Sequence, residues 1–130
     1  MLTTLFANTL YIQVRKNRFR LRHIEGKQER EVSAQTPFTT TRLLLGQFQA
    51  AETLLKQAIR AIGSGGLFQV SPVVVIHPME MVEGGLSEVE ERALRELAKG
   101  AGARQVFVHI GAVLSDAEVL ALSQNKQRTN

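Results

Sequence analysis

The chain lacks cysteine altogether, and none of its 130 residues belong to an apolar run of about 18 or more. Without cysteine it can form neither disulfides nor thiolate metal sites, which fits a reducing compartment. The sequence does not open with a basic segment followed by an apolar one, the pattern of a secretory signal. These absences together predict a cytoplasmic protein with no transmembrane segment.

Acidic residues that could hold a catalytic metal are also scarce. Asp116 is the only aspartate, and the predicted strands 9–15 and 18–24 carry no acidic residue. A nuclease needs several carboxylates around a metal ion, so we do not expect one here. The glycine-rich segment 63–66 follows a helical pattern and lacks the Lys-Ser/Thr pair of a phosphate loop, so it predicts a helix end.

The residues that are present are typical of one globular domain. The chain is 44% hydrophobic and 22% charged, which is enough apolar material for a core at this length. We predict a single domain over residues 1–122 and a polar tail over residues 123–130.

The net charge of +4 is concentrated near the start of the chain. Residues 1–30 hold seven basic and two acidic side chains, and the remainder holds nine basic and ten acidic ones. Arg18, Arg20 and Arg22 alternate with apolar residues, so they share one face of a strand. Such a stripe either attracts nucleic acid or an anionic membrane, or protects an exposed sheet edge.

Apolar runs predict five strands. Residues 9–15 and 18–24 alternate around a polar break, as in a hairpin, and a weaker third strand is expected near 31–34. Residues 73–76 and 106–110 are largely continuous apolar runs, as in parallel strands buried on both faces. The core positions expected in these two runs are Val74, Ile76, Val106 and Val108.

Three helices are expected among the strands. The hydroxyls of residues 39–41 are suited to cap the first helix, which the glycine at 63 would end. Its apolar face consists of Leu44, Phe48, Ala51, Leu55, Ala58 and Ile62. Ser87 and Glu90 form a capping-box pattern for a second helix that runs to about Lys99. Ser115 and Asp116 can cap a short third helix that runs through Leu122.

The predicted fold class is therefore α/β. A mixed five-stranded sheet would have antiparallel strands at the N-terminal side, parallel strands at the C-terminal side and helices packed on it. The helix between the last two strands predicts a right-handed parallel crossover.

This order resembles the ribonuclease-H-like half-domain of actin, sugar kinases and Hsp70. A closer similarity is to the MreB family, the bacterial actins of rod-shape determination. Residues 87–96 (SEVEERALRE) and 100–107 (GAGARQVF) resemble that family's TEVERRA-I/V-RE and GAGAREV-F/Y. Residues 7–11 (ANTLY) are similar to the family's ANTL-I/V-Y, which follows its first strand.

The same resemblance indicates which catalytic groups are missing. The family's first phosphate loop, DLGTAN, aligns with residues 3–8. Thr3 replaces the aspartate that addresses the metal, and Leu5 replaces the glycine that lets backbone N–H groups approach phosphate. The family's EEP, which supplies the glutamate that positions the attacking water, aligns with residues 110–112 (IGA). The resemblance therefore implies an actin-like half-domain that is not an enzyme and holds no cofactor.

Two histidines leave a metal site open as an alternative. His77 and His109 lie at or near the carboxyl ends of strands that we expect to be neighbours. With Glu80 they could form a site of two histidines and one carboxylate. In the other interpretation, His77 leads into a turn at Pro78 and His109 is a core histidine with satisfied hydrogen bonds.

The favoured function is a non-catalytic interaction domain, possessing no second half-domain of its own and linked by resemblance to cell-shape or cytoskeletal machinery. Leu2, Leu5 and Phe6, where the phosphate loop would be, are candidates to contact a protein partner or a second copy in a dimer. The alternative is that the face formed by Arg18, Arg20 and Arg22 binds nucleic acid or an anionic membrane.

Overall fold

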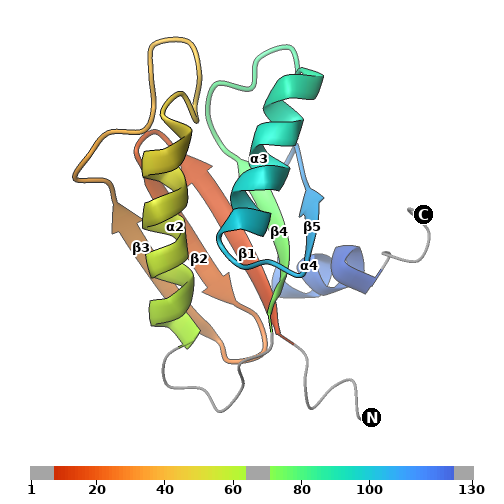
Figure 1. The fold of residues 1–130 in the computed structure, drawn as a ribbon. Coiled ribbons are helices and arrows are strands. Elements are labelled where there is room, and N and C mark those ends of the chain that lie inside the picture. The colour runs from red at the N-terminus through yellow and green to blue at the C-terminus, as the bar shows by residue number, and fades with distance from the viewer. Residues whose placement is uncertain (1–7, 64–70, 125–130) are drawn as a thin grey trace.

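The computed structural model describes residues 8–63 and 71–124, and within them a mixed sheet carries helices on both faces (Figure 1). The strands are β1 (Thr9–Arg15), β2 (Arg18–His23), β3 (Gln28–Ser33), β4 (Val73–Pro78) and β5 (Gln105–Val108). The helices are α2 (Phe48–Gly63), α3 (Glu88–Gly100) and α4 (Asp116–Ser123). The sheet order is β3-β2-β1-β4-β5. Strand β2 is antiparallel to both β1 and β3, and β4 is parallel to both β1 and β5, as the sequence predicts.

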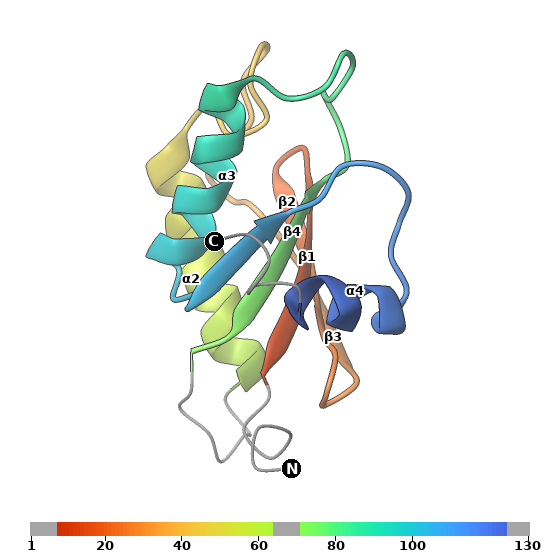
Figure 2. The same ribbon diagram turned by 90° about the vertical axis from the view of Figure 1, so that its right-hand side faces the viewer.

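The molecule has three layers. Helices α2 and α3 cover one face of the sheet and α4 covers the other (Figure 1, Figure 2). The larger core lies under α2 and α3 and includes Ile12, Leu55 and Ile76, all fully buried. The smaller core lies under α4 and consists of Tyr11, Ile24, Val75, Leu114 and Val119. Because both faces are covered, β1 and β4 are buried along nearly their whole length.

Strand β2 has one buried face and one charged face. Phe19 and Leu21 are fully buried in the larger core, and the Phe19 ring stacks on Phe38 with 4.9 Å between centroids. The alternating arginines therefore point to the opposite face of the sheet, since neighbouring side chains on a strand alternate.

The predicted capping serines begin α3 and α4. Ser87 and Glu90 form the predicted capping box of α3, whereas at α4 Ser115 forms a box with Glu118, which was not predicted, and Asp116 is the first residue of the helix. In each box the serine hydroxyl accepts the glutamate N–H, and the glutamate carboxylate accepts the serine N–H. These paired bonds satisfy N–H groups that the helix itself leaves unpaired.

The predicted start of α2 is wrong. The helix begins at Phe48, and Leu44 enters the larger core from the preceding loop. The threonine hydroxyls bind loop backbone instead of a helix end: Thr39 Oγ1 donates to Leu44 O at 2.8 Å and Thr40 Oγ1 accepts from Leu43 N at 3.2 Å. The glycines at 65 and 66 lie outside the described residues, so only the end of α2 at Gly63 can be compared.

Two strand predictions also change. Strand β5 stops at Val108, and this valine is only half-buried because β5 is at an edge of the sheet; Val74, Ile76 and Val106 are core residues as expected. The third strand begins at Gln28, earlier than the sequence indicates. Its residues are mostly exposed, so no apolar alternation marks its start.

Candidate functional site

Strands β1, β4 and β5 end on the same side of the sheet. The 34–47 loop and the 79–87 loop lie at this end, and the 109–115 loop leaves from it (Figure 1, Figure 2). In open α/β sheets, ligands bind beyond the carboxyl ends of the strands. A functional site is therefore expected at this end of the sheet.

The turn between β1 and β2 at this end has its N–H groups occupied. Lys16 N donates to Glu80 Oε2 at 2.8 Å, and Asn17 N donates to Thr39 Oγ1 at 3.0 Å. The Asn17 side chain accepts the N–H groups of Phe38 and Thr39, each at 2.8 Å. Free backbone N–H groups are what a phosphate-binding loop presents, and this turn presents a carboxylate beside N–H groups that are already bonded.

His77 belongs to a buried hydrogen-bond network. Its Nε2 donates to Gly111 O at 3.0 Å, and because a carbonyl can only accept, Nδ1 accepts the Tyr11 hydroxyl at 2.6 Å. The Tyr11 oxygen also accepts Leu114 N–H at 3.2 Å. Burial, followed by the neighbouring His109, lowers the pKa of His77. Burial and His109 therefore favour the neutral form of His77, and the network ties β1 and β4 to the loop before α4.

The described residues do not assemble the metal site that the sequence left open. His109 lies against His77 with 4.6 Å between ring centroids, and its Nε2 donates to Ala112 O at 2.9 Å. Glu80 is bonded to the turn after β1. Within residues 8–63 and 71–124 no three histidine, aspartate or glutamate side chains are grouped to hold a metal ion. His77 has the satisfied core environment of the alternative interpretation.

The position aligned with the family's second glutamate has an unusual backbone. Gly111 has a φ of 129°, in the region that residues with a side chain rarely adopt. Its neighbour Ile110, aligned with the first glutamate, is 45% exposed. The loop thus presents an apolar side chain next to a glycine-dependent bend.

Two of the three arginines on β2 are paired with glutamates of β3. Arg20 Nη2 lies 2.6 Å from Glu29 Oε1, and Arg18 Nε lies 3.7 Å from Glu31 Oε2. About half of each of these side chains is exposed, so each pair contributes at most about 1 kcal/mol to stability. Their main effect is to place a negative charge beside each positive one.

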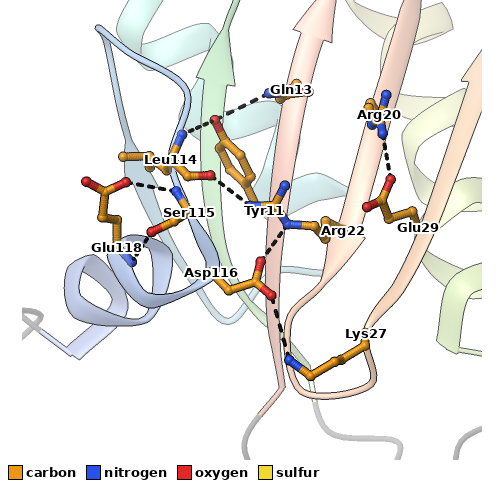
Figure 3. A network of polar contacts seen from close by, with 10 residues as sticks. All are labelled: Tyr11, Gln13, Arg20, Arg22, Lys27, Glu29, Leu114, Ser115, Asp116 and Glu118. Atoms are coloured by element: carbon orange, nitrogen blue, oxygen red, sulfur yellow. Dashed lines mark hydrogen bonds and ion pairs between the residues drawn. The ribbon is translucent and has the colours of Figure 1, made fainter.

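Arg22 instead connects β2 to the start of α4 (Figure 3). Its Nη2 donates to Leu114 O at 2.8 Å, and its guanidinium lies 5.0 Å from the centre of the Tyr11 ring. Its Nε lies 2.7 Å from Asp116 Oδ1, but this buried nitrogen makes no hydrogen bond, so we treat the contact as one of charge. Asp116 also lies 3.9 Å from Lys27 Nζ. Arg22 is therefore a packing residue of the helix interface.

An apolar groove opens beside the carboxyl end of the sheet. Its walls are the 43–45 segment, the residues that follow β4 and the first turns of α3, and ten of its twelve lining residues are apolar. Four large apolar side chains stand out as exposed in the described part of the chain. They are Leu43, Val89, Ile110 and Val113.

The predicted contact residues and the exposed ones fall in different segments. Leu2, Leu5 and Phe6 lie outside the described residues. Leu43, Val89 and Val113 were not predicted as contact residues. The three successive leucines at 43–45 are a visible apolar signal, whereas Val89 lies inside a capping box, a pattern that indicates only a helix start.

The sheet order and the helices on both faces define an actin-type half-domain of the ribonuclease-H-like class. The model of the MreB/Mbl protein family matches residues 20–124. The chain therefore belongs to the MreB/Mbl family, as its sequence motifs indicate.

Two kinds of relative are similar to this chain. The uncharacterized protein YjaA of Escherichia coli (strain K12) is 39% identical over 128 residues, which cover 92% of this chain and 99% of YjaA. The cell shape-determining protein MreB of the same strain is 37% identical over 65 residues, half of this chain and 18% of MreB. MreB of Haemophilus influenzae is 30% identical over 89 residues, 64% of this chain and 24% of that protein. The chain thus spans about a fifth of the length of the MreB relatives.

Within residues 8–63 and 71–124, no helix is long and apolar enough to cross a membrane.

Proposed function

We propose that this chain is a non-catalytic interaction domain of the MreB/Mbl family, which works in the cytoplasm by binding a protein partner or a second copy of itself. The observation that carries the proposal is the position of its exposed apolar side chains. Leu43 and Val89 belong to segments at the end where β1, β4 and β5 end, and Ile110 and Val113 belong to the 109–115 loop, which runs from this end to α4. Contiguous exposed apolar surface is typical of a contact site.

The same end offers little to a nucleotide. The N–H groups of Lys16 and Asn17 are already bonded, and the Glu80 carboxylate beside them would repel a phosphate. The bend at Gly111 does not suit a catalytic glutamate. These features support a role without ATP chemistry. Since the relatives include the cell shape-determining protein MreB, we place the proposed partner in the cell-shape machinery.

The alternative function, binding of nucleic acid or an anionic membrane by the arginine face, has weaker support. Arg18, Arg20 and Arg22 each have a carboxylate within 4 Å, at distances of 3.7, 2.6 and 2.7 Å. Their positive charge is largely offset where a phosphate would have to bind. A contact to phosphate would also lose affinity steeply with added salt, whereas an apolar contact would not.

Light scattering across micromolar concentrations, together with affinity capture from the native cell, tests the proposal. We expect the wild-type protein to self-associate or to retain a specific partner. Replacing Leu43, Val89, Ile110 and Val113 together by asparagine should abolish this. The matched control replaces Thr53, Lys56, Gln57 and Arg60, exposed residues of α2, by asparagine and should leave it intact. A wild-type protein that stays monomeric and retains no partner would overturn the proposal.

A further inference from the structure

The apolar groove beside α3 has a closed floor and an open mouth. Leu44 and Leu94 are 8% and 3% exposed and belong to the larger core, so they form a fixed floor. Leu43 and Val89 are 47% and 76% exposed and stand at the edges. The groove is therefore preformed, and a group that enters it would also cover these two side chains.

The size of the hollow limits what can enter. Its volume is about 70 Å³, roughly half of the 150 Å³ of an engineered cavity that binds benzene. That space is enough for one aliphatic side chain. A leucine or isoleucine presented by a short segment is the occupant that fits.

The charged lining specifies what should flank this side chain. The two charged residues of the lining are Glu80 and Glu90, and no basic residue lines the groove. Their carboxylates accept backbone N–H groups, from Lys16 at 2.8 Å and from Ser87 at 2.9 Å. Within the described residues neither glutamate has an ion-pair partner. Lysine or arginine in an incoming segment would complement them.

We propose that this groove binds a peptide segment of a partner protein, in which one leucine or isoleucine is flanked by lysine or arginine. The inference rests on the proposed function and names the partner's chemistry. A second copy of the chain is a poorer occupant. Two-fold pairing through this groove would bring Glu80 and Glu90 of both copies together, since a two-fold interface presents the same patch twice.

The binding experiment uses a synthetic fluorescent nonapeptide with a central leucine, two lysines on each side and serine elsewhere, followed by anisotropy at low salt. We expect the wild-type protein to bind it with a dissociation constant tighter than about 1 mM. Changing the central leucine to alanine should weaken binding about tenfold or more, as expected for a pocket that loses methylene groups. Exchanging the lysines for glutamates should abolish binding, because like charges would meet.

Variants of the protein locate the site. Ala93→Leu extends a lining residue into the hollow, and Val89→Lys adds a cation at the exposed edge; each should weaken binding about tenfold or more. Glu80→Gln with Glu90→Gln removes both charges but keeps an oxygen for the N–H groups of Lys16 and Ser87. This double variant should bind the lysine peptide and a peptide with serine in place of the four lysines equally well. Thr53→Asn, at an exposed position of α2 that does not line the groove, is the control and should bind as the wild type does.

Any of three results would overturn the inference: the lysine peptide does not bind, the leucine and alanine peptides bind equally well, or Ala93→Leu and Val89→Lys both leave the affinity for the peptide unchanged. A dimer that Ala93→Leu dissociates, without peptide binding, would assign the groove to a second copy instead. Association that depends only on Ile110 and Val113 would leave the proposed function standing while the groove inference fails.

Discussion

Removing the Tyr11 hydroxyl tests how the loop before α4 is held on its face of the sheet. Tyr11→Phe keeps the buried ring and leaves two buried groups without a partner, His77 Nδ1 and Leu114 N–H, which lie 2.6 and 3.2 Å from the hydroxyl. The contact of Gln13 Nε2 at 3.4 Å is long and adds little. An unsatisfied buried group costs about 1–3 kcal/mol. We therefore expect Tyr11→Phe to lower the free energy of unfolding by about 2–4 kcal/mol.

Urea unfolding followed by circular dichroism measures this loss. With a slope of about 1–3 kcal/mol per molar urea, the midpoint should fall by about 1–2 M and the slope should not change. In a His77→Phe background the same substitution should cost less, because the Nδ1 acceptor is already gone, and a double-mutant cycle would give the coupling. A loss below about 0.5 kcal/mol in the wild-type background would refute the reasoning, because it would mean that the hydroxyl is not needed to satisfy these groups.

Three further predictions concern acid, the core and ATP. Because burial and His109 lower the pKa of His77, its contribution to stability should be fully present above about pH 6.5, the ordinary value, and be lost as the pH falls below it, since only the unfolded chain takes up the proton there. Urea midpoints between pH 8 and pH 5 should therefore fall more in the wild type than in His77→Gln. Ile76→Ala, at a fully buried position, should cost about 2–5 kcal/mol by thermal unfolding, and an unchanged melting temperature would contradict the placement of β4 in the core. Calorimetry with Mg-ATP should detect no binding tighter than about 100 μM, and a tighter constant would contradict the absence of a nucleotide site.

Local patterns predicted the central elements of the fold well. The alternation over residues 9–15 and the apolar run from residue 73 identify β1 and β4, because a strand with a buried face leaves a period of two or a continuous apolar stretch. The serine-glutamate capping box at 87–90 fixes the start of α3 for a similar reason, since the box is completed within four residues, and the predicted cap at Ser115 marks the start of α4. Features that are determined by contacts between residues close in the sequence can be predicted from it.

Features that depend on distant contacts could not be predicted. The threonines at 39–41 have hydroxyls that bind helix ends and loop carbonyls equally well, so only the packing of the loop decides that α2 begins at Phe48. Tyr11 and His77 are 66 residues apart, and the groove is assembled from three separate segments. The exposed fraction of Val89 likewise depends on which neighbours cover it.

The hydrogen bond between Tyr11 and Leu114 also sets an order of events during synthesis. Its two residues are 103 positions apart, a distance that a ribosome covers in about 5–20 s at roughly 5–20 residues per second. Before α4 is made, α2 and α3 can cover their side of the sheet, but the side that carries Tyr11 and Val75 has no cover. From the completion of β5 at Val108 to that of α4 at Ser123, about 1–3 s at the same rate, the sheet is covered on one face only. Helix α4 covers the other face once it has been translated and packed.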